Sequence, residues 1–190
     1  KRVEGFHSVF ISHYDGGVQM AKHFLNVGFR RMGYIGPVSS STSARKYAGY
    51  RDHLLTNRAE LVDIIECDPP ENMNATQVYE NVKKYAAVHG IRSEVFFAND
   101  DITACEAMAA LMDLGYSIPG DIAVAGFDNS LLAKEATPKL TSLAQPLEEI
   151  GKKAVEVLLG QIRQNTDPQL YELETRVVAR ASTVNWKSPL

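Results

Sequence analysis

Short apolar runs alternate with amphipathic segments along almost the whole chain, and this alternation is the feature that most restricts its fold. Runs with the length and composition of β-strands occur at residues 8–12, 32–35, 60–66, 95–98, 121–125, 141–144 and 173–179. Apolar residues recur at helical spacing at residues 18–26, 44–55, 75–89, 102–112 and 147–162. Parallel strands need a crossover helix between them, so the alternation predicts an α/β fold with a doubly wound, mostly parallel sheet.

The composition indicates an ordinary folded domain and excludes two classes of protein. Of the 190 residues, 45% are hydrophobic and 23% are charged. The sequence contains no run of about 18 apolar residues, the length that a membrane span needs. The net charge is -3 and the basic residues are scattered, so this chain alone is poorly suited to binding a phosphate backbone. Cys67 and Cys105 lack metal-ligand spacing and fit reduced thiols, so we expect a cytoplasmic location.

Polar residues follow three of the predicted strands at the point where each strand ends. Arg45 and Lys46 follow the second strand, Asn99 follows the fourth, and Asp128 follows the fifth. In open α/β sheets, ligands bind outside the carboxyl ends of the strands. Cationic, amide and carboxylate groups there both donate and accept hydrogen bonds, so the pattern predicts a site for a polyhydroxylated small molecule.

Each of these residues also fits a purely structural role. Asn99, Asp100 or Asp101 fits the N-cap of the following helix, and we prefer this role for Asp100 and Asp101. Asp128 fits an Asx turn, and a lysine or arginine on a helix most often faces solvent. The prediction of a ligand site therefore depends on the joint occurrence of these residues.

Four segments, in this order, resemble the effector-binding core of LacI/GalR transcriptional regulators. They are ISHYDGG, GFRRMGYIGPVSSSTSARKYAGYRDHL, FFANDDITACEAMAALMDLGYSIPGDIAVAGFDN and TPKLTSLAQPLEEIGKKAVEVLL. The resemblance extends over nearly the whole chain, and the AND, IPGDIAVAGFDN and KLTSLAQP blocks carry most of its specificity. It implies a periplasmic-binding-protein-like type I fold, in which two α/β lobes hold a small effector in the cleft between them.

The resemblance also implies a set of effector-binding residues. Asn99 and Asp128 fall on family positions that hydrogen-bond the effector. Gln145 and Leu147 fall on a pair that lines the cleft near the hinge, and Thr42 matches a hydroxyl position in the loop.

The cationic position differs from the usual pattern of the family. The resemblance implies an arginine three residues before the glycine of an RxxG unit, where this sequence has Lys46, with Arg45 directly before it. An ammonium does not reproduce the bidentate guanidinium fork, so we expect a difference in effector identity or affinity. The segment 68–74, where relatives often place a stacking aromatic residue, contains none.

A division into two lobes, one of them incomplete, follows from the same resemblance. We expect residues 32–143 and 174–190 to form the C-terminal effector-binding lobe, and residues 1–31 and 144–173 to be a remnant of the N-terminal lobe. The family's helix-turn-helix DNA-binding domain and the first βαβαβ run have no counterpart in this sequence. The helices assigned to the remnant are therefore expected to lack their usual sheet partner, so that a second copy covers them or they are mobile.

The implied function is effector sensing in a LacI-type regulator. A small molecule, commonly a sugar in this family, would bind in the cleft and control allosterically how the helix-turn-helix of a homodimer binds operator DNA. A periplasmic sugar-binding protein or a receptor ligand-binding domain is the alternative, because both share the fold. We expect no enzyme, cofactor or metal site, since GxGxxG, GxxxxGK[ST], GxSxG and HExxH motifs are absent and the histidines are dispersed.

Overall fold

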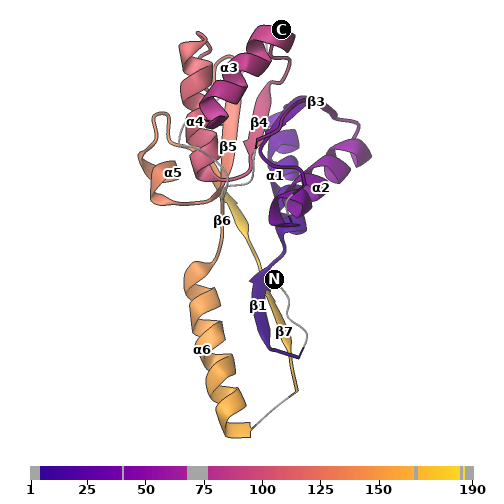
Figure 1. The fold of residues 1–190 in the computed structure, drawn as a ribbon, viewed down its shortest axis with the longest axis vertical. Helices are drawn as coiled ribbons and strands as arrows, with labels where there is room; N and C mark the ends of the chain where they lie inside the picture. The colour runs from indigo at the N-terminus through magenta and orange to yellow at the C-terminus, as the bar shows by residue number, and fades with distance from the viewer. Residues whose placement is uncertain (1–4, 40, 68–76, 165–166, 185, 187–190) are drawn as a thin grey trace. The chain divides into compact units, whose positions relative to one another are not determined.

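The computed structural model describes residues 5–39, 41–67, 77–164, 167–184 and 186 (Figure 1). The chain divides into two compact units. Unit 1 comprises Lys1–Ser12 and Gln145–Arg176, and unit 2 comprises His13–Ala144 and Val177–Leu190.

Unit 2 is built on a six-stranded sheet with helices packed along it. The strands lie in the order β3 (Glu60–Ile65), β2 (Arg31–Ile35), β4 (Val95–Ala98), β5 (Ala123–Asp128), β6 (Thr141–Ala144) and β8 (Arg176–Val178). The helices are α1 (His13–Val27), α2 (Ser41–Thr56), α3 (Gln77–His89), α4 (Asp101–Asp113) and α5 (Leu131–Glu135). Neighbouring strands from β3 to β6 are parallel, so the predicted α/β architecture is confirmed.

Successive residues of the central strand β4 face opposite sides of the sheet and join different clusters. Phe96 belongs to a buried core that includes Val82 of α3 and Leu111 of α4. Phe97 lies against Tyr50 of α2, with ring centroids 5.2 Å apart. Figure 1 shows α3 and α4 on one side of the sheet and α1 and α2 on the other. A strand covered by helices on both faces buries every side chain, which explains the continuous apolar run of β4.

Helix α1 packs so closely on α2 that glycine is required at the contact. A Cβ on Gly17 would lie 2.1 Å from the carbonyl oxygen of Lys46, and a Cβ on Gly49 would lie 2.0 Å from that of Tyr14. The apolar face of α1 is buried, with Phe24 fully enclosed. These contacts place α1 in unit 2, whereas the expected lobe boundary left it with the first lobe. The apolar face of α1 is therefore covered within unit 2, in contrast to the expectation that a second copy covers this helix or that it is mobile.

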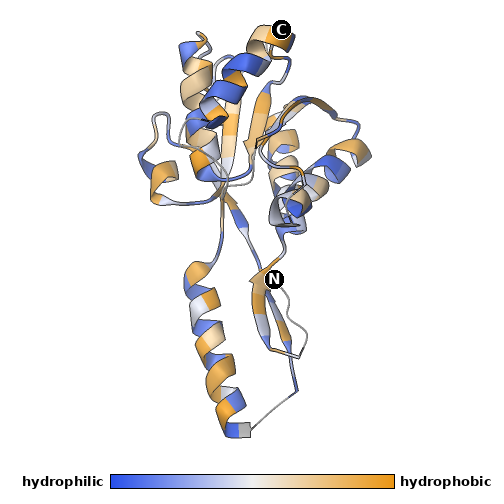
Figure 2. Ribbon diagram, in the orientation of Figure 1, coloured by the Kyte–Doolittle hydropathy of each residue, from blue (hydrophilic) through white to orange (hydrophobic). Residues whose placement is uncertain are grey.

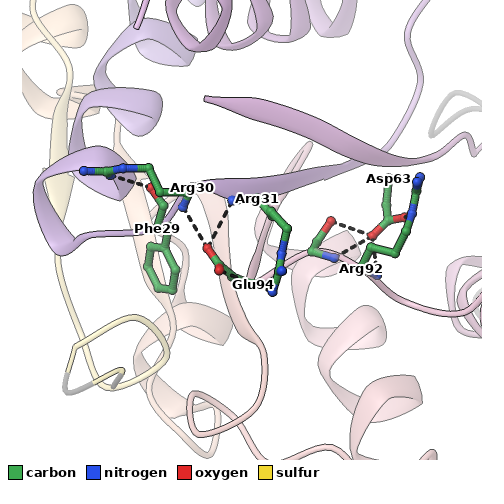
Figure 3. A network of polar contacts seen from close by, with 7 residues as sticks. Phe29, Arg30, Arg31, Asp63, Arg92 and Glu94 are labelled. Carbon is green, nitrogen blue, oxygen red and sulfur yellow. Dashed lines mark hydrogen bonds and ion pairs between the residues drawn. The ribbon is translucent and has the colours of Figure 1, made fainter. Parts of the chain in front are cut away.

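Two carboxylates bind backbone N–H groups where β4 begins (Figure 3). Asp63 of β3 is fully buried and accepts hydrogen bonds from the N–H of Ser93 at 2.7 Å and its Oγ at 2.6 Å. It also accepts from the N–H of Arg92 at 2.9 Å. Glu94 accepts from the N–H of Arg31 at 3.0 Å. These bonds fasten the segment before β4 to both β2 and β3.

Unit 1 has a two-stranded parallel sheet, in which β1 (Ser8–Ile11) pairs with β7 (Leu170–Leu173). Helix α6 (Leu147–Gln164) contacts β1. Large apolar side chains along α6 are exposed, namely Leu147, Val155, Leu158, Leu159 and Ile162. Figure 2 shows hydrophobic and hydrophilic residues alternating along this helix. The single strand predicted at residues 173–179 is instead two short strands, β7 and β8, which join different sheets.

Candidate functional site

The carboxyl ends of three neighbouring strands gather predicted polar residues at one edge of the unit 2 sheet. Strands β2, β4 and β5 are adjacent and parallel. Asn99 directly follows β4, Asp128 ends β5, and Lys46 reaches this edge from α2. The structure thus brings together three residues that the sequence singled out.

Asn99 is 3% exposed, and both its backbone and its side chain form hydrogen bonds. Its N–H donates to the carbonyl of Ile35 at 2.9 Å, and its side-chain amide donates to the carboxylate of Asp100 at 3.0 Å. Asp100 accepts a hydrogen bond from the N–H of Thr103 at 2.8 Å, so its predicted role as the N-cap of α4 is confirmed. The same prediction for Asp101 is wrong, because its carboxylate binds other elements of unit 2.

Lys46 points into unit 2, and only 6% of it is exposed. Its Nζ donates to the backbone oxygen of Asn99 at 2.7 Å and lies 4.0 Å from the ring centroid of Phe127. Burial lowers the pKa of Lys46, and the nearby carboxylates of Asp128 and Asp100 oppose this shift. The ammonium therefore links the ends of β4 and β5 from within the fold.

The other unit 2 candidates are more open to solvent. Thr42 and Arg45 of α2 are exposed, and Asp128 is half-buried. Arg45 thus offers the exposed cation that Lys46 does not. Asp128 has a φ of +105°, a value that residues with side chains rarely adopt, so the backbone around it must be held by its surroundings.

His13 belongs to this edge, although the sequence did not single it out. Its ring stacks on Phe127, with centroids 6.0 Å apart and ring planes 6° apart. Burial lowers the pKa of His13, and the charge of Lys46 lowers it further, so both effects favour the neutral imidazole. The sequence signal that could have found it is its place directly after the first predicted strand.

Gln145 and Leu147 belong to unit 1. The N–H of Leu147 donates to the carbonyl of Gln145 at 2.9 Å, and the side chain of Leu147 is exposed. Their contribution to an effector site remains a prediction. The segment 68–74, with its missing aromatic residue, lies outside the described residues.

Within the part of the chain that the structure describes, no three His, Cys, Asp or Glu side chains gather as a metal site would require. None of the helices in that part combines the length and apolar character needed to cross a membrane.

Comparison with known proteins identifies the family. The profile of the periplasmic binding protein-like domain matches residues 21–183. The chain belongs to this family. The HTH-type transcriptional repressor PurR of Escherichia fergusonii is 29% identical over 185 residues, which cover 94% of the chain and 52% of the relative. The chain therefore spans about half the length of the curated relatives that it matches.

Solved structures place this periplasmic binding protein-like chain among LacI/GalR-type effector-binding cores. The CelR transcriptional regulator in complex with cellobiose is 27% identical with a TM-score of 0.81, and the match covers 94% of this chain and 54% of that one. The dimeric Lac repressor with an 11-residue C-terminal deletion is 25% identical with a TM-score of 0.83, covering 96% and 66%. A LacI family regulator of Enterococcus faecalis with bound ribose is 26% identical with a TM-score of 0.81, covering 98% and 67%. These relatives are regulators and repressors, in agreement with the prediction that the chain is not an enzyme.

Proposed function

We propose that this chain senses a small effector in a LacI-type transcriptional regulator, and that the effector is a sugar or a related hydroxylated metabolite. The observation that carries the proposal is the meeting of Lys46, Asn99 and Asp128 at the carboxyl ends of parallel strands. Ligands bind at this edge in open α/β sheets. The cellobiose and ribose bound to relatives of the same family support a sugar.

Different residues of unit 2 would make different contributions to effector binding. Asp128 carries acceptor oxygens for two hydroxyl groups, and Asn99 carries both an acceptor and donors. Thr42 and Arg45, exposed on α2, would contact the effector from the loop side. Lys46 already donates to Asn99, so it would brace the strand ends and contribute positive charge more than direct contact.

Residues of both lobes would contribute to the effector site. We assign unit 2 to the C-terminal lobe and unit 1 to part of the N-terminal lobe, with Gln145 and Leu147 lining the cleft near the hinge. The exposed apolar face of α6 would pack on the rest of that lobe. An effector that bound both arrangements of the lobes equally would shift nothing, so regulation requires a difference in affinity between them.

Operator binding, homodimer formation and a cytoplasmic location complete the proposal. The net charge of -3 gives these residues little attraction for DNA, so we assign operator contact to a helix-turn-helix outside this sequence. The relative described as a dimeric Lac repressor supports a homodimer. Sedimentation of a version carrying both lobes tests this, and a mass of one chain would argue against it.

The effector site is tested by Asp128→Asn in a version that carries both lobes. Removing the charge should weaken binding of ribose or cellobiose by roughly 10-fold or more, because hydrogen bonds to a charged acceptor contribute about 1.5–3 kcal/mol. Asp113→Asn is the matched control. Asp113 is an exposed aspartate at the C-terminal end of α4, whereas the N-terminal end of this helix is the one next to the candidate site. Titration calorimetry measures both. Equal affinity of the wild type and Asp128→Asn would mean that the site lies elsewhere.

A further inference from the structure

The proposed effector contacts make no use of a buried carboxylate that lies close to Asp128. Asp101, in the first turn of α4, is 2% exposed. One carboxylate oxygen accepts a hydrogen bond from the hydroxyl of Ser142 in β6 at 2.6 Å. The other accepts from the N–H of Ser130, in the loop after β5, at 2.7 Å. The carboxylate thus joins three elements of unit 2.

The loop that this carboxylate holds has an unusual backbone conformation. Asp128 and Asn129 are consecutive residues with positive φ, at +105° and +54°. Asparagine tolerates the left-handed region, but an aspartate at +105° is kept there only by the surrounding structure. The direction of the Asp128 side chain therefore depends on the bonds that fix this loop.

Those bonds surround Asn129. Its N–H donates to the hydroxyl oxygen of Ser142 at 2.9 Å, the same hydroxyl that donates to Asp101. Its side-chain oxygen accepts from the guanidinium of Arg180 at 2.5 Å, and Arg180 also donates to the carbonyl of Leu140 at 2.7 Å. The Ser142 hydroxyl therefore connects the Asp101 carboxylate to Asn129, the residue that follows Asp128, through two hydrogen bonds.

The glycine of the GFDN segment makes room for this arrangement. A Cβ on Gly126 would lie 2.5 Å from a carboxylate oxygen of Asp101 and 3.1 Å from its Cα. Real Cβ contacts of 2.5 Å essentially do not occur. The bare backbone of β5 is thus what allows Asp101 to approach the strand that carries Asp128.

We propose that Asp101 is a positioning residue, which holds the loop 128–130 so that the Asp128 carboxylate faces the effector. The carboxylate is needed because it accepts from Ser130 and Ser142 at once. An asparagine offers one acceptor oxygen, so it would satisfy one of these donors and leave the loop held from one side. The effect on affinity rests on the proposed function, whereas the effect on the loop does not.

The test compares Asp101→Asn with Asp63→Asn, which is a matched control within unit 2. Asp63 is also a fully buried carboxylate that accepts from a backbone N–H and a serine hydroxyl, but it lies where β4 begins. Hydrogen exchange followed by NMR reports the amides of Asn129 and Ser130, each relative to the slowest-exchanging amides of unit 2. Titration with ribose and cellobiose, in a version carrying both lobes, reports affinity.

We expect Asp101→Asn to lower the protection of both amides at least 10-fold and to weaken sugar binding by a similar factor. Asp63→Asn should leave the protection of both amides, relative to the slowest-exchanging amides of unit 2, unchanged, although it lowers overall stability. Should Asp101→Asn fail to fold, Ser142→Ala is the milder variant, and it should loosen Asn129 more than Ser130.

Unchanged protection of Asn129 and Ser130 in the variants would overturn the proposal. So would a loosened loop with wild-type sugar affinity, because positioning would then be irrelevant to binding. If the wild type binds neither sugar, the proposed function fails with these effectors. The exchange measurement still decides the role of Asp101 in that case: loss of protection supports it and retention overturns it.

Discussion

Gly49→Ala should destabilise unit 2 by about 3 kcal/mol or more, at the upper end of the cost of overpacking a core. The added Cβ would lie 2.0 Å from the backbone oxygen of Tyr14, and neither helix backbone can move aside as a flexible side chain would. Helices α1 and α2 must separate to accept the methyl group, which opens the packing around Phe24. Gly17→Ala should behave in the same way, with a contact of 2.1 Å to Lys46.

Urea denaturation measures this change. The single tryptophan, Trp186, has its ring 4.3 Å from that of Phe29, so its fluorescence reports unit 2. Gly160→Ala is the control, because Gly160 lies in α6 with open space around its Cβ position. Followed by circular dichroism, it should be neutral or stabilising by up to about 1 kcal/mol, since alanine is the better helix former. An equally stable Gly49→Ala would show that α1 does not pack on α2 as described.

Asp63→Ala should lower the free energy of unfolding at pH 7 by about 3 kcal/mol, because it leaves buried N–H groups without an acceptor. Four of its hydrogen bonds come from Arg92 and Ser93, and a fifth comes from the hydroxyl of Tyr85 at 3.2 Å. Burial by itself raises the pKa of Asp63. The hydrogen bonds from Ser93, Arg92 and Tyr85 outweigh burial and hold the pKa below its ordinary value of 3.8.

A depressed pKa gives this group a defined pH dependence. Its stabilisation is fully present above pH 3.8 and is lost as the pH falls through the lower folded-state pKa. The stability difference between the wild type and Asp63→Ala should therefore shrink on acidification. Asp121→Ala is the control, since Asp121 accepts from the N–H and hydroxyl of Ser117 at an exposed position where water can replace it. Equal effects of the two substitutions at pH 7 would contradict this account.

The fold and the edge that carries the site could be read from the sequence because they depend on periodicity. Buried parallel strands such as β4 are continuous apolar runs, and the polar residues that end them must lie at one edge. The cap role of Asp100 was equally accessible, since an N-cap depends on local chain geometry.

Features that depend on contacts between distant segments could not be predicted. Nothing near Gly17 and Gly49 in the sequence reveals that two helix backbones meet there, so the expected lobe boundary separates α1 from α2, although both lie in unit 2. The inward direction of Lys46 depends on where Asn99 and Phe127 lie in space. Asp101 differs from the adjacent Asp100 because its partners lie some 30 to 40 residues further along the chain.

The most direct test of the central claim is ribose and cellobiose titration of the 190-residue chain beside a version that carries both lobes. We expect saturable binding by the longer version and weak or undetectable binding by the chain, because the proposed site draws on residues of both lobes. Asp128→Asn should weaken the binding that is observed. Tight binding by the 190-residue chain that survives Asp128→Asn would contradict both the shared site and the role of Asp128.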